Sequence, residues 1–224
     1  MNLEVIALNL DDAKEIEGFG ANRIELVTNI AKGGFSPEIV QVKQIVDNLN
    51  IPVNVMVRFK EDFVYNQEEF NKCLDYIKEL KETNANALVF GSLNEDGSIN
   101  EEQLEEVCRI KGKLKLTFHR AIDSSKDLLE SIKTLNKYDV DVILTSGGLD
   151  KPILENIDLL KEMSLKSKAK ILLGGGINID NYSKLIDSID NVDIHVGSLA
   201  YNESNFNKGI NKDNICSLLD YIKE

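Results

Sequence analysis

The two histidines of the chain both lie near the carboxyl ends of segments in which apolar and polar residues alternate. His119 ends the segment Leu114–His119, and His195 lies in the segment Val192–Val196. Histidine titrates near neutral pH, so its side chain can both donate and accept a proton there. Glu25 belongs to a third alternating segment. Residues of these types indicate general acid–base chemistry.

Glycine-rich loops and arginines indicate a second kind of chemistry, the binding of an anion. Three glycines follow one apolar segment, at residues 174–176. Glycine has no Cβ, so backbone N–H groups can approach an anion closely, although three glycines are also compatible with a tight turn alone. A guanidinium group binds phosphate or carboxylate through two parallel hydrogen bonds. The candidate anion-binding residues are Arg58, Arg120, Ser146, Gly147, Gly174, Gly175, Gly176, Gly197 and Ser198.

Eight short apolar segments alternate with eight amphipathic segments along the chain. Strands are expected at Leu3–Ala7, Arg23–Leu26, Pro52–Arg58, Ala87–Phe90, Leu114–His119, Val140–Thr145, Lys170–Leu173 and Val192–Val196. Helices are expected at Asp11–Phe19, Pro37–Asn48, Gln67–Glu82, Glu101–Ile110, Lys126–Lys137, Pro152–Lys166, Ile179–Ser188 and Asp213–Lys223. This alternation predicts an α/β protein with a (β/α)8 TIM-barrel fold, in one domain over residues 1–224. A doubly wound open sheet is the alternative, but no GxGxxG motif follows the first strand.

The predicted barrel brings the candidate residues together. Active sites of such barrels lie at the carboxyl ends of the strands. The more apolar side of each strand should face the surrounding helices, so the other side should face the barrel axis. Buried charges need partners, and we therefore expect Glu4, Arg23, Glu25 and Arg58 to form an inward network. The candidate catalytic residues are His119, Glu25, Arg58, His195 and Glu4, with a purely structural network as the alternative.

Other polar residues near strand ends differ from these in parity or in position. Arg120 has the outward parity of its strand, and Asp123 suits the cap of the following helix. Lys115 and Asp193 lie at the beginnings of strands and are expected at the opposite, stabilising face of the barrel.

The composition limits the classes of partner. The formal net charge is −12, so the chain lacks the basic surface that binding to nucleic acid or to anionic membranes requires. No run of about 18 apolar residues predicts a transmembrane helix, and the amino terminus does not resemble a signal peptide. The three cysteines are widely spaced, which is typical of free thiols in a reducing cytoplasm.

Several stretches resemble the CutC family of copper homeostasis proteins. They occur in the family's order over nearly the whole chain, and the most distinctive are 22–26 (NRIEL), 33–37 (GGFSP), 117–123 (TFHRAID), 144–148 (LTSGG) and 195–198 (HVGS). The resemblance implies a cytoplasmic TIM barrel that is associated with copper homeostasis, binds copper ions and forms a homo-oligomer such as a dimer. It leaves the molecular activity open.

The chain departs from the family pattern where copper would bind. Ile6 and Val27 occupy positions at which family members often carry cysteine. Cu(I) prefers thiolate and thioether ligands. The inward side chains that remain as candidate copper ligands are Met56, His119 and His195.

The sequence is therefore compatible with two main hypotheses about the function. The first is copper handling, as the resemblance implies. The second is a metabolic enzyme that acts on a small anionic compound, such as a phosphorylated one, with a histidine or glutamate as general acid or base. A scaffold without a working pocket is a third alternative. The sequence does not decide whether the protein is an enzyme.

Overall fold

Eight parallel strands close into a barrel in the computed structural model, which describes residues 1–223. Each strand pairs with the next in the chain, and the last pairs with the first. The strands are β1 (Leu3–Ala7), β2 (Arg23–Leu26), β3 (Val53–Met56), β4 (Ala87–Phe90), β5 (Lys115–Phe118), β6 (Val142–Thr145), β7 (Lys170–Leu173) and β8 (Val192–Val196). The prediction of an α/β (β/α)8 barrel is confirmed.

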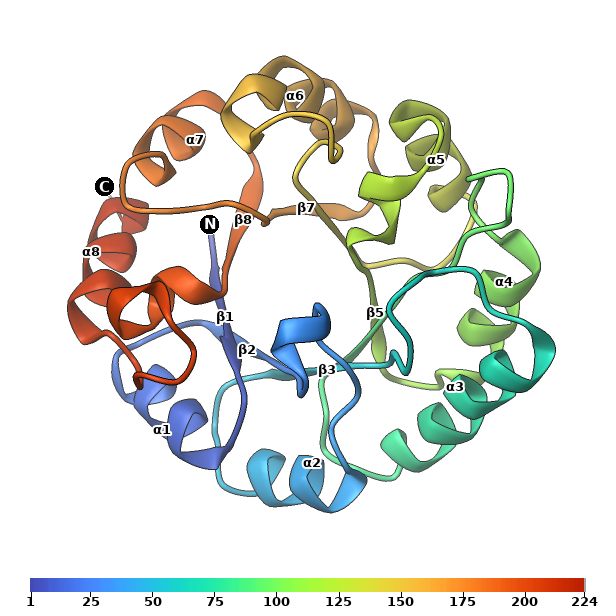
Figure 1. Cartoon of the computed structure of the whole chain (residues 1–224), viewed down its shortest axis with the longest axis horizontal. Helices are drawn as coiled ribbons and strands as arrows, with labels where there is room; N and C mark the ends of the chain where they lie inside the picture. Colours follow the sequence, from blue (N-terminus) through green and yellow to red (C-terminus); the bar gives the residue numbers. More distant parts are fainter. Residues whose placement is uncertain (224) are drawn as a thin grey trace.

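A ring of helices surrounds the barrel (Figure 1). The α-helices are α1 (Leu10–Gly18), α2 (Ile39–Val46), α3 (Gln67–Leu80), α4 (Glu101–Ile110), α5 (Leu128–Leu135), α6 (Ile157–Lys166), α7 (Tyr182–Ser188) and α8 (Lys212–Lys223). Some begin later than the sequence suggests. Asp127 accepts hydrogen bonds from the amides of Leu129 and Glu130, so α5 begins after it. Within residues 1–223, no helix combines the length and the apolar character that crossing a membrane requires.

The two sides of the strands pack into separate apolar clusters. Leu3, Val5 and Ala7 of β1 belong to the large core that lies between the strands and the helices. Ile6 belongs instead to a small cluster with Val27, Met56 and Val89. This separation agrees with the alternation predicted for β1 and β3, in which the more apolar side of the strand faces the helices.

Short 3-10 helices follow several strands at the carboxyl-end face. The first, η1 (Ile30–Lys32), lies across the centre of the ring in Figure 1. The second, η2 (Arg120–Ser124), follows β5, and η4 (Ser198–Ala200) follows β8. These segments form the rim of the barrel mouth, where the candidate site lies.

Candidate functional site

A buried polar network fills the barrel around Glu4. The strand register places Glu4 of β1 beside Arg23 of β2 and beside His195 of β8. Glu4 Oε2 accepts hydrogen bonds from Arg23 Nε at 2.6 Å and from Asn54 Nδ2 at 2.8 Å. Glu4 Oε1 lies 2.7 Å from His195 Nδ1. Both oxygens of Glu4 are therefore engaged, which suits a positioning role better than direct chemistry.

The network continues towards the amino-terminal end of the barrel, as expected for Asp193. Arg23 Nη1 donates to Asp193 Oδ2 at 2.8 Å, and the Asn2 amide donates to Asp193 Oδ1 at 2.9 Å. Arg58 is absent from this network, contrary to the sequence-based expectation. Its place as a partner of Glu4 is taken by Asn54, whose position in β3 lies beside Glu25 in the sheet register.

His195 lies between two buried glutamates. Its Nδ1 faces Glu4, and its Nε2 lies 3.8 Å from Glu25 Oε2. Burial favours the neutral form of Glu4, but the hydrogen bond from His195 and the charge of Arg23 lower its pKa to about 2. Glu4 is thus a carboxylate that accepts the Nδ1 proton of His195, which leaves Nε2 as the atom that exchanges protons.

The pKa of Glu25 is shifted in the opposite direction from the pKa of Glu4. Burial raises the pKa of Glu25 from an ordinary value of 4.5 to about 7. Burial lowers the pKa of His195, but the charges of Glu25 and Glu4 outweigh it and raise that pKa. Among the described residues, Glu25 Oε1 has no hydrogen-bond partner. The His195–Glu25 pair therefore retains a proton near neutral pH, and it includes a buried carboxylate oxygen that has no partner among the described residues.

The proton on Glu25 links folding to pH. The pKa of Glu25 in the folded protein, about 7, lies above its ordinary value of 4.5. Between these pH values the folded protein holds a proton that the unfolded chain has released. The contribution of Glu25 to stability is therefore complete below about pH 4.5 and is lost as the pH rises through 7.

A cavity of about 260 Å³ opens at the barrel mouth next to this pair. Glu25, His195 and His119 all line it, so the two histidines share one cavity. Apolar side chains form much of the remaining wall, namely Ile6, Ile30, Met56, Phe63, Leu144 and Ile177. A small ligand here would have limited contact with water, and this strengthens its electrostatic interactions with the wall.

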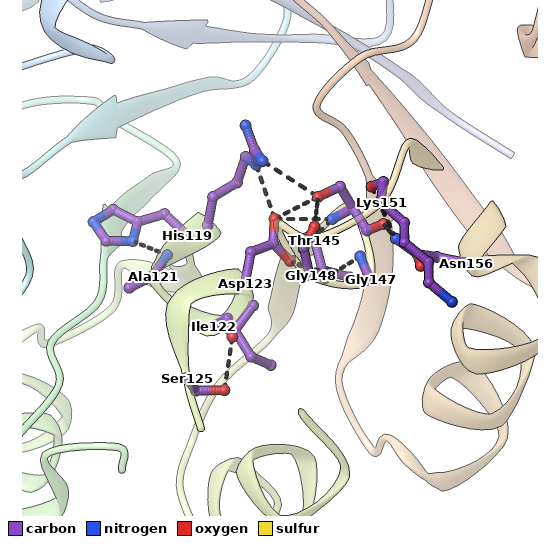
Figure 2. A network of polar contacts seen from close by, with 12 residues as sticks. His119, Ala121, Ile122, Asp123, Ser125, Thr145, Gly147, Gly148, Lys151 and Asn156 are labelled. Carbon is purple, nitrogen blue, oxygen red and sulfur yellow. Dashed lines mark hydrogen bonds and ion pairs between the residues drawn. The ribbon is translucent and has the colours of Figure 1, made fainter. Parts of the chain in front are cut away.

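His119 is fixed in one tautomer by its own backbone. Its Nδ1 accepts a hydrogen bond from the Ala121 amide at 3.2 Å, as Figure 2 shows. Nδ1 must then carry a lone pair, so the neutral ring carries its proton on Nε2. Burial and the nearby charge of Arg58 lower the pKa of His119 to about 3. His119 is therefore a neutral N–H donor near neutral pH, and Nε2 has no partner among the described residues.

Arg58 mainly secures the loop that contains η1. Its Nη1 donates to the carbonyl oxygen of Gly33 at 2.9 Å, and its Nη2 donates to the carbonyl oxygen of Glu61. The guanidinium carbon lies 4.8 Å from the centre of the Phe63 ring. Both terminal nitrogens are thus engaged, and the Nε atom of Arg58, which has no partner in residues 1–223, is the part left for a ligand.

Asp123 holds the loop after β6 instead of capping α5. Its carboxylate accepts hydrogen bonds from Thr145 Oγ1 at 2.5 Å, from Ser146 Oγ at 2.8 Å and from the Ser146 amide at 3.1 Å (Figure 2). Asp123 Oδ2 also accepts from Arg120 Nε at 2.9 Å. Arg120 is thereby held at the rim, with about 41% of its side chain exposed.

The backbone amides of the glycine-rich loops are of two kinds. Some donate hydrogen bonds within the protein, and others have no acceptor among the described residues. The amide of Gly147 donates to Thr145 Oγ1, and the amide of Gly174 donates to the Thr145 carbonyl oxygen. The amides of Gly175 and Gly176 make no hydrogen bond within the described part of the chain. Gly175 has a φ of +92°, and a Cβ there would lie 2.7 Å from Arg120 Cζ. Glycine therefore lets Arg120 cross the loop beside two available amides.

The structure brings several of the residues nominated from the sequence onto one cavity, but their connections differ from those expected, and their roles stay a prediction. These residues are Glu25, His119, His195 and Arg58, together with Gly197 and Ser198. The role of Asp123 was missed, because the partners of Asp123 lie in a loop more than 20 residues away. The run Thr145-Ser146-Gly147-Gly148, which is rich in donors, was the available signal.

Comparisons with known proteins identify the family of the chain. A family model described as the CutC family matches residues 1–199. The chain belongs to the CutC family. Copper homeostasis protein cutC homolog from Homo sapiens is 32% identical over 205 residues, which cover 90% of this chain and 75% of the human protein. The homolog from Drosophila melanogaster is 32% identical over 205 residues, which cover 89% of this chain and 78% of the relative.

A solved CutC structure has the same fold. The CutC protein from Streptococcus agalactiae superposes with a TM-score of 0.81 at 30% sequence identity, over 88% of this chain and 98% of that chain. Most sulfur atoms of this CutC-family chain lie outside the cavity at the barrel mouth. Cys73 is buried on α3, and Cys108 and Cys216 are partly buried on α4 and α8. Met56 is the one sulfur-containing residue among the described residues that line the cavity.

Proposed function

We propose that this CutC-family barrel is an enzyme that transfers a proton to or from a small anionic compound at the barrel mouth. Glu25 and His195 are the proton-transferring pair, and Glu4 positions His195. The observation that carries the proposal is the unpartnered oxygen of Glu25, which belongs to a buried acid with a pKa of about 7 on the wall of a cavity. Perturbed acids of this kind are typical of catalytic sites.

The anionic group of the ligand is assigned to the rim between η2 and the loop after β7. Arg120 offers a partly exposed guanidinium there, next to the available amides of Gly175 and Gly176. Ser198 and Gly197 line the same cavity on the β8 side. The Nε atom of Arg58 lies deeper and adds a further donor. Ser146, whose hydroxyl contacts Arg120 and Asp123, positions the arginine.

Inorganic phosphate tests the anion site directly. We expect saturable binding by isothermal titration calorimetry, and we expect Arg120→Gln to weaken it at least about tenfold, which corresponds to about 1.4 kcal/mol. The control is Arg109→Gln on α4, because Arg109 is an exposed arginine whose single ion-pair partner within residues 1–223 is Glu106 of its own helix. Equal affinities in the two variants, or no saturable binding by the unaltered protein, would contradict the anion assignment.

Copper is the second candidate ligand, as a cargo ion, because the names of the relatives associate them with copper homeostasis. Met56, His119 and His195 all line the cavity. His119 fits poorly, since its Nε2 carries a proton and its Nδ1 faces the Ala121 amide. The candidate copper ligands are thereby reduced to the thioether of Met56 and the imidazole of His195. Cu(I) prefers thiolate ligands, and neither residue supplies one.

We therefore expect Cu(I) binding at this site to be too weak to contribute to the measured affinity. A competition titration against a Cu(I) chelator should give the same affinity for the unaltered protein and for the triple variant Met56→Leu, His119→Ala, His195→Ala. Any remaining binding would come from the cysteines outside the cavity. A large loss of affinity in the triple variant would instead establish copper as the ligand of the barrel mouth.

The proposal also covers the domain organisation, location, oligomeric state and partners of the protein. We propose a single TIM-barrel domain over residues 1–224 that works in the cytoplasm as a homo-oligomer such as a dimer. It takes a small-molecule anion as its partner and binds neither nucleic acid nor membrane. The net charge of −12 supports the exclusion of polyanionic partners.

A further inference from the structure

His119 faces the same cavity as the proton-transferring pair but has a different chemical character. The ring is about 3% exposed and lines the cavity. Its Nδ1 is occupied by the Ala121 amide, so the proton resides on Nε2. Nε2 has no partner among residues 1–223, and a buried N–H without an acceptor is unfavourable. A ligand oxygen would satisfy this donor.

We propose that His119 Nε2–H donates to a carbonyl oxygen of the substrate, and that the substrate is an anionic carbonyl compound with a removable proton on the neighbouring carbon. This inference rests on the proposed function and names the substrate class of the same site. A neutral donor of this kind stabilises an oxygen that gains negative charge during the reaction, without giving up its own proton.

The rest of the cavity wall favours proton abstraction over other reactions at a carbonyl group. Among the described residues that line the cavity, none is a lysine or a cysteine. A Schiff base or a thiol adduct therefore has no nucleophile there. Glu25 does line the same cavity, and its Oε1 has no hydrogen-bond partner among the described residues. A carboxylate and a neutral N–H donor are the two groups that enolisation requires.

The proposed step conserves atoms and electrons. The C–H bond next to the carbonyl group breaks, and its proton passes to the Glu25 carboxylate. The electron pair of that bond forms a carbon–carbon double bond, and the π pair of the carbonyl group moves to the oxygen. That oxygen accepts the hydrogen bond from His119 Nε2–H. Return of a proton from Glu25 to the same carbon re-forms the C–H bond, and the electron pair on the oxygen restores the carbonyl group.

Solvent deuterium exchange tests the step without knowledge of the natural substrate. The probe is dihydroxyacetone phosphate, which has an anionic group, a carbonyl group and neighbouring C–H bonds. In D2O, proton NMR should show deuterium incorporation that the unaltered protein catalyses and that Glu25→Gln abolishes. His119→Asn should lower the exchange rate at least about 100-fold, the usual loss for one such donor.

The His119→Asn variant removes the N–H donor but keeps the local hydrogen bond that the fold uses. The asparagine side-chain oxygen can still accept from the Ala121 amide, as a capping residue does, but it places no N–H where Nε2 lies. Phosphate affinity should therefore stay within about twofold of the unaltered protein, because the anion is bound by other groups. Nitrogen-15 NMR of the histidine ring gives an independent readout, namely the Nε2–H tautomer across neutral pH.

The outcomes distinguish this inference from the proposed function. Exchange that depends on Glu25 but is unchanged in His119→Asn would overturn the inference and leave the proposed function standing. Phosphate binding without any exchange of the probe, or an Nδ1–H tautomer of His119, would also overturn the inference alone. The absence of both phosphate binding and exchange would overturn the inference and the proposed function together.

Discussion

Replacement of Glu4 by alanine is expected to destabilise the protein by about 3–5 kcal/mol. Glu4 is about 1% exposed and accepts hydrogen bonds from side chains on three other strands. Its removal leaves the Arg23 guanidinium partly uncompensated and His195 without the carboxylate that orients it. A buried charge that loses its partner is among the largest single sources of instability. Urea unfolding monitored by circular dichroism measures the loss.

An exposed ion pair provides the matched control for Glu4. Glu101 pairs with Lys137 and accepts from Tyr138 Oη at the protein surface. Glu101→Ala should cost no more than about 1 kcal/mol, because water screens exposed pairs. If Glu4→Ala were as mild as Glu101→Ala, the network around Glu4 could not be the element that holds His195 in place.

Replacement of Asp123 by alanine has a comparable expected effect, about 3–5 kcal/mol, for a different reason. The change removes the acceptor of four donors at the end of β6 and in the loop that follows, two of them backbone amides at Ser146 and Gly148. It also releases Arg120 from its ion pair at the rim. We therefore expect a lower unfolding free energy together with weaker phosphate binding.

A variant of the nearby Asp127 is the control that distinguishes the anchoring of the loop by Asp123 from the ordinary capping of a helix. Asp127 accepts two backbone hydrogen bonds at the start of α5 and is exposed. Asp127→Ala should cost about 1 kcal/mol, as the loss of a helix cap does, and should leave phosphate affinity unchanged. Similar unfolding curves for the two variants would show that Asp123 is merely another cap.

The fold could be predicted from the sequence because its signals are local. Each strand carries its own alternation, and the eight-fold repeat of strand and helix needs no distant information. The inward side of β1, β2 and β8 followed from parity alone, as did the placement of Glu4, Glu25 and His195 inside the barrel.

The connections within the site depend on register and on loop geometry, which the sequence does not display. Arg58 has the inward parity of its strand, yet its terminal nitrogens reach the carbonyl oxygens of Gly33 and Glu61 in neighbouring loops. Arg120 has the outward parity, yet η2 turns it back over the rim. The tautomer of His119 likewise depends on one backbone amide two residues away.

The proposed chemistry depends on the protonation of Glu25, and a carbon-13 NMR titration of its side-chain carboxyl group measures this directly. The resonance can be assigned by its absence from Glu25→Gln. Burial beside Glu4, with His195 and Arg23 close by, predicts an apparent pKa of about 7 for Glu25. A Glu25 carboxyl group that titrates near its ordinary value of 4.5 would contradict its assignment as the proton-transferring acid of the barrel mouth.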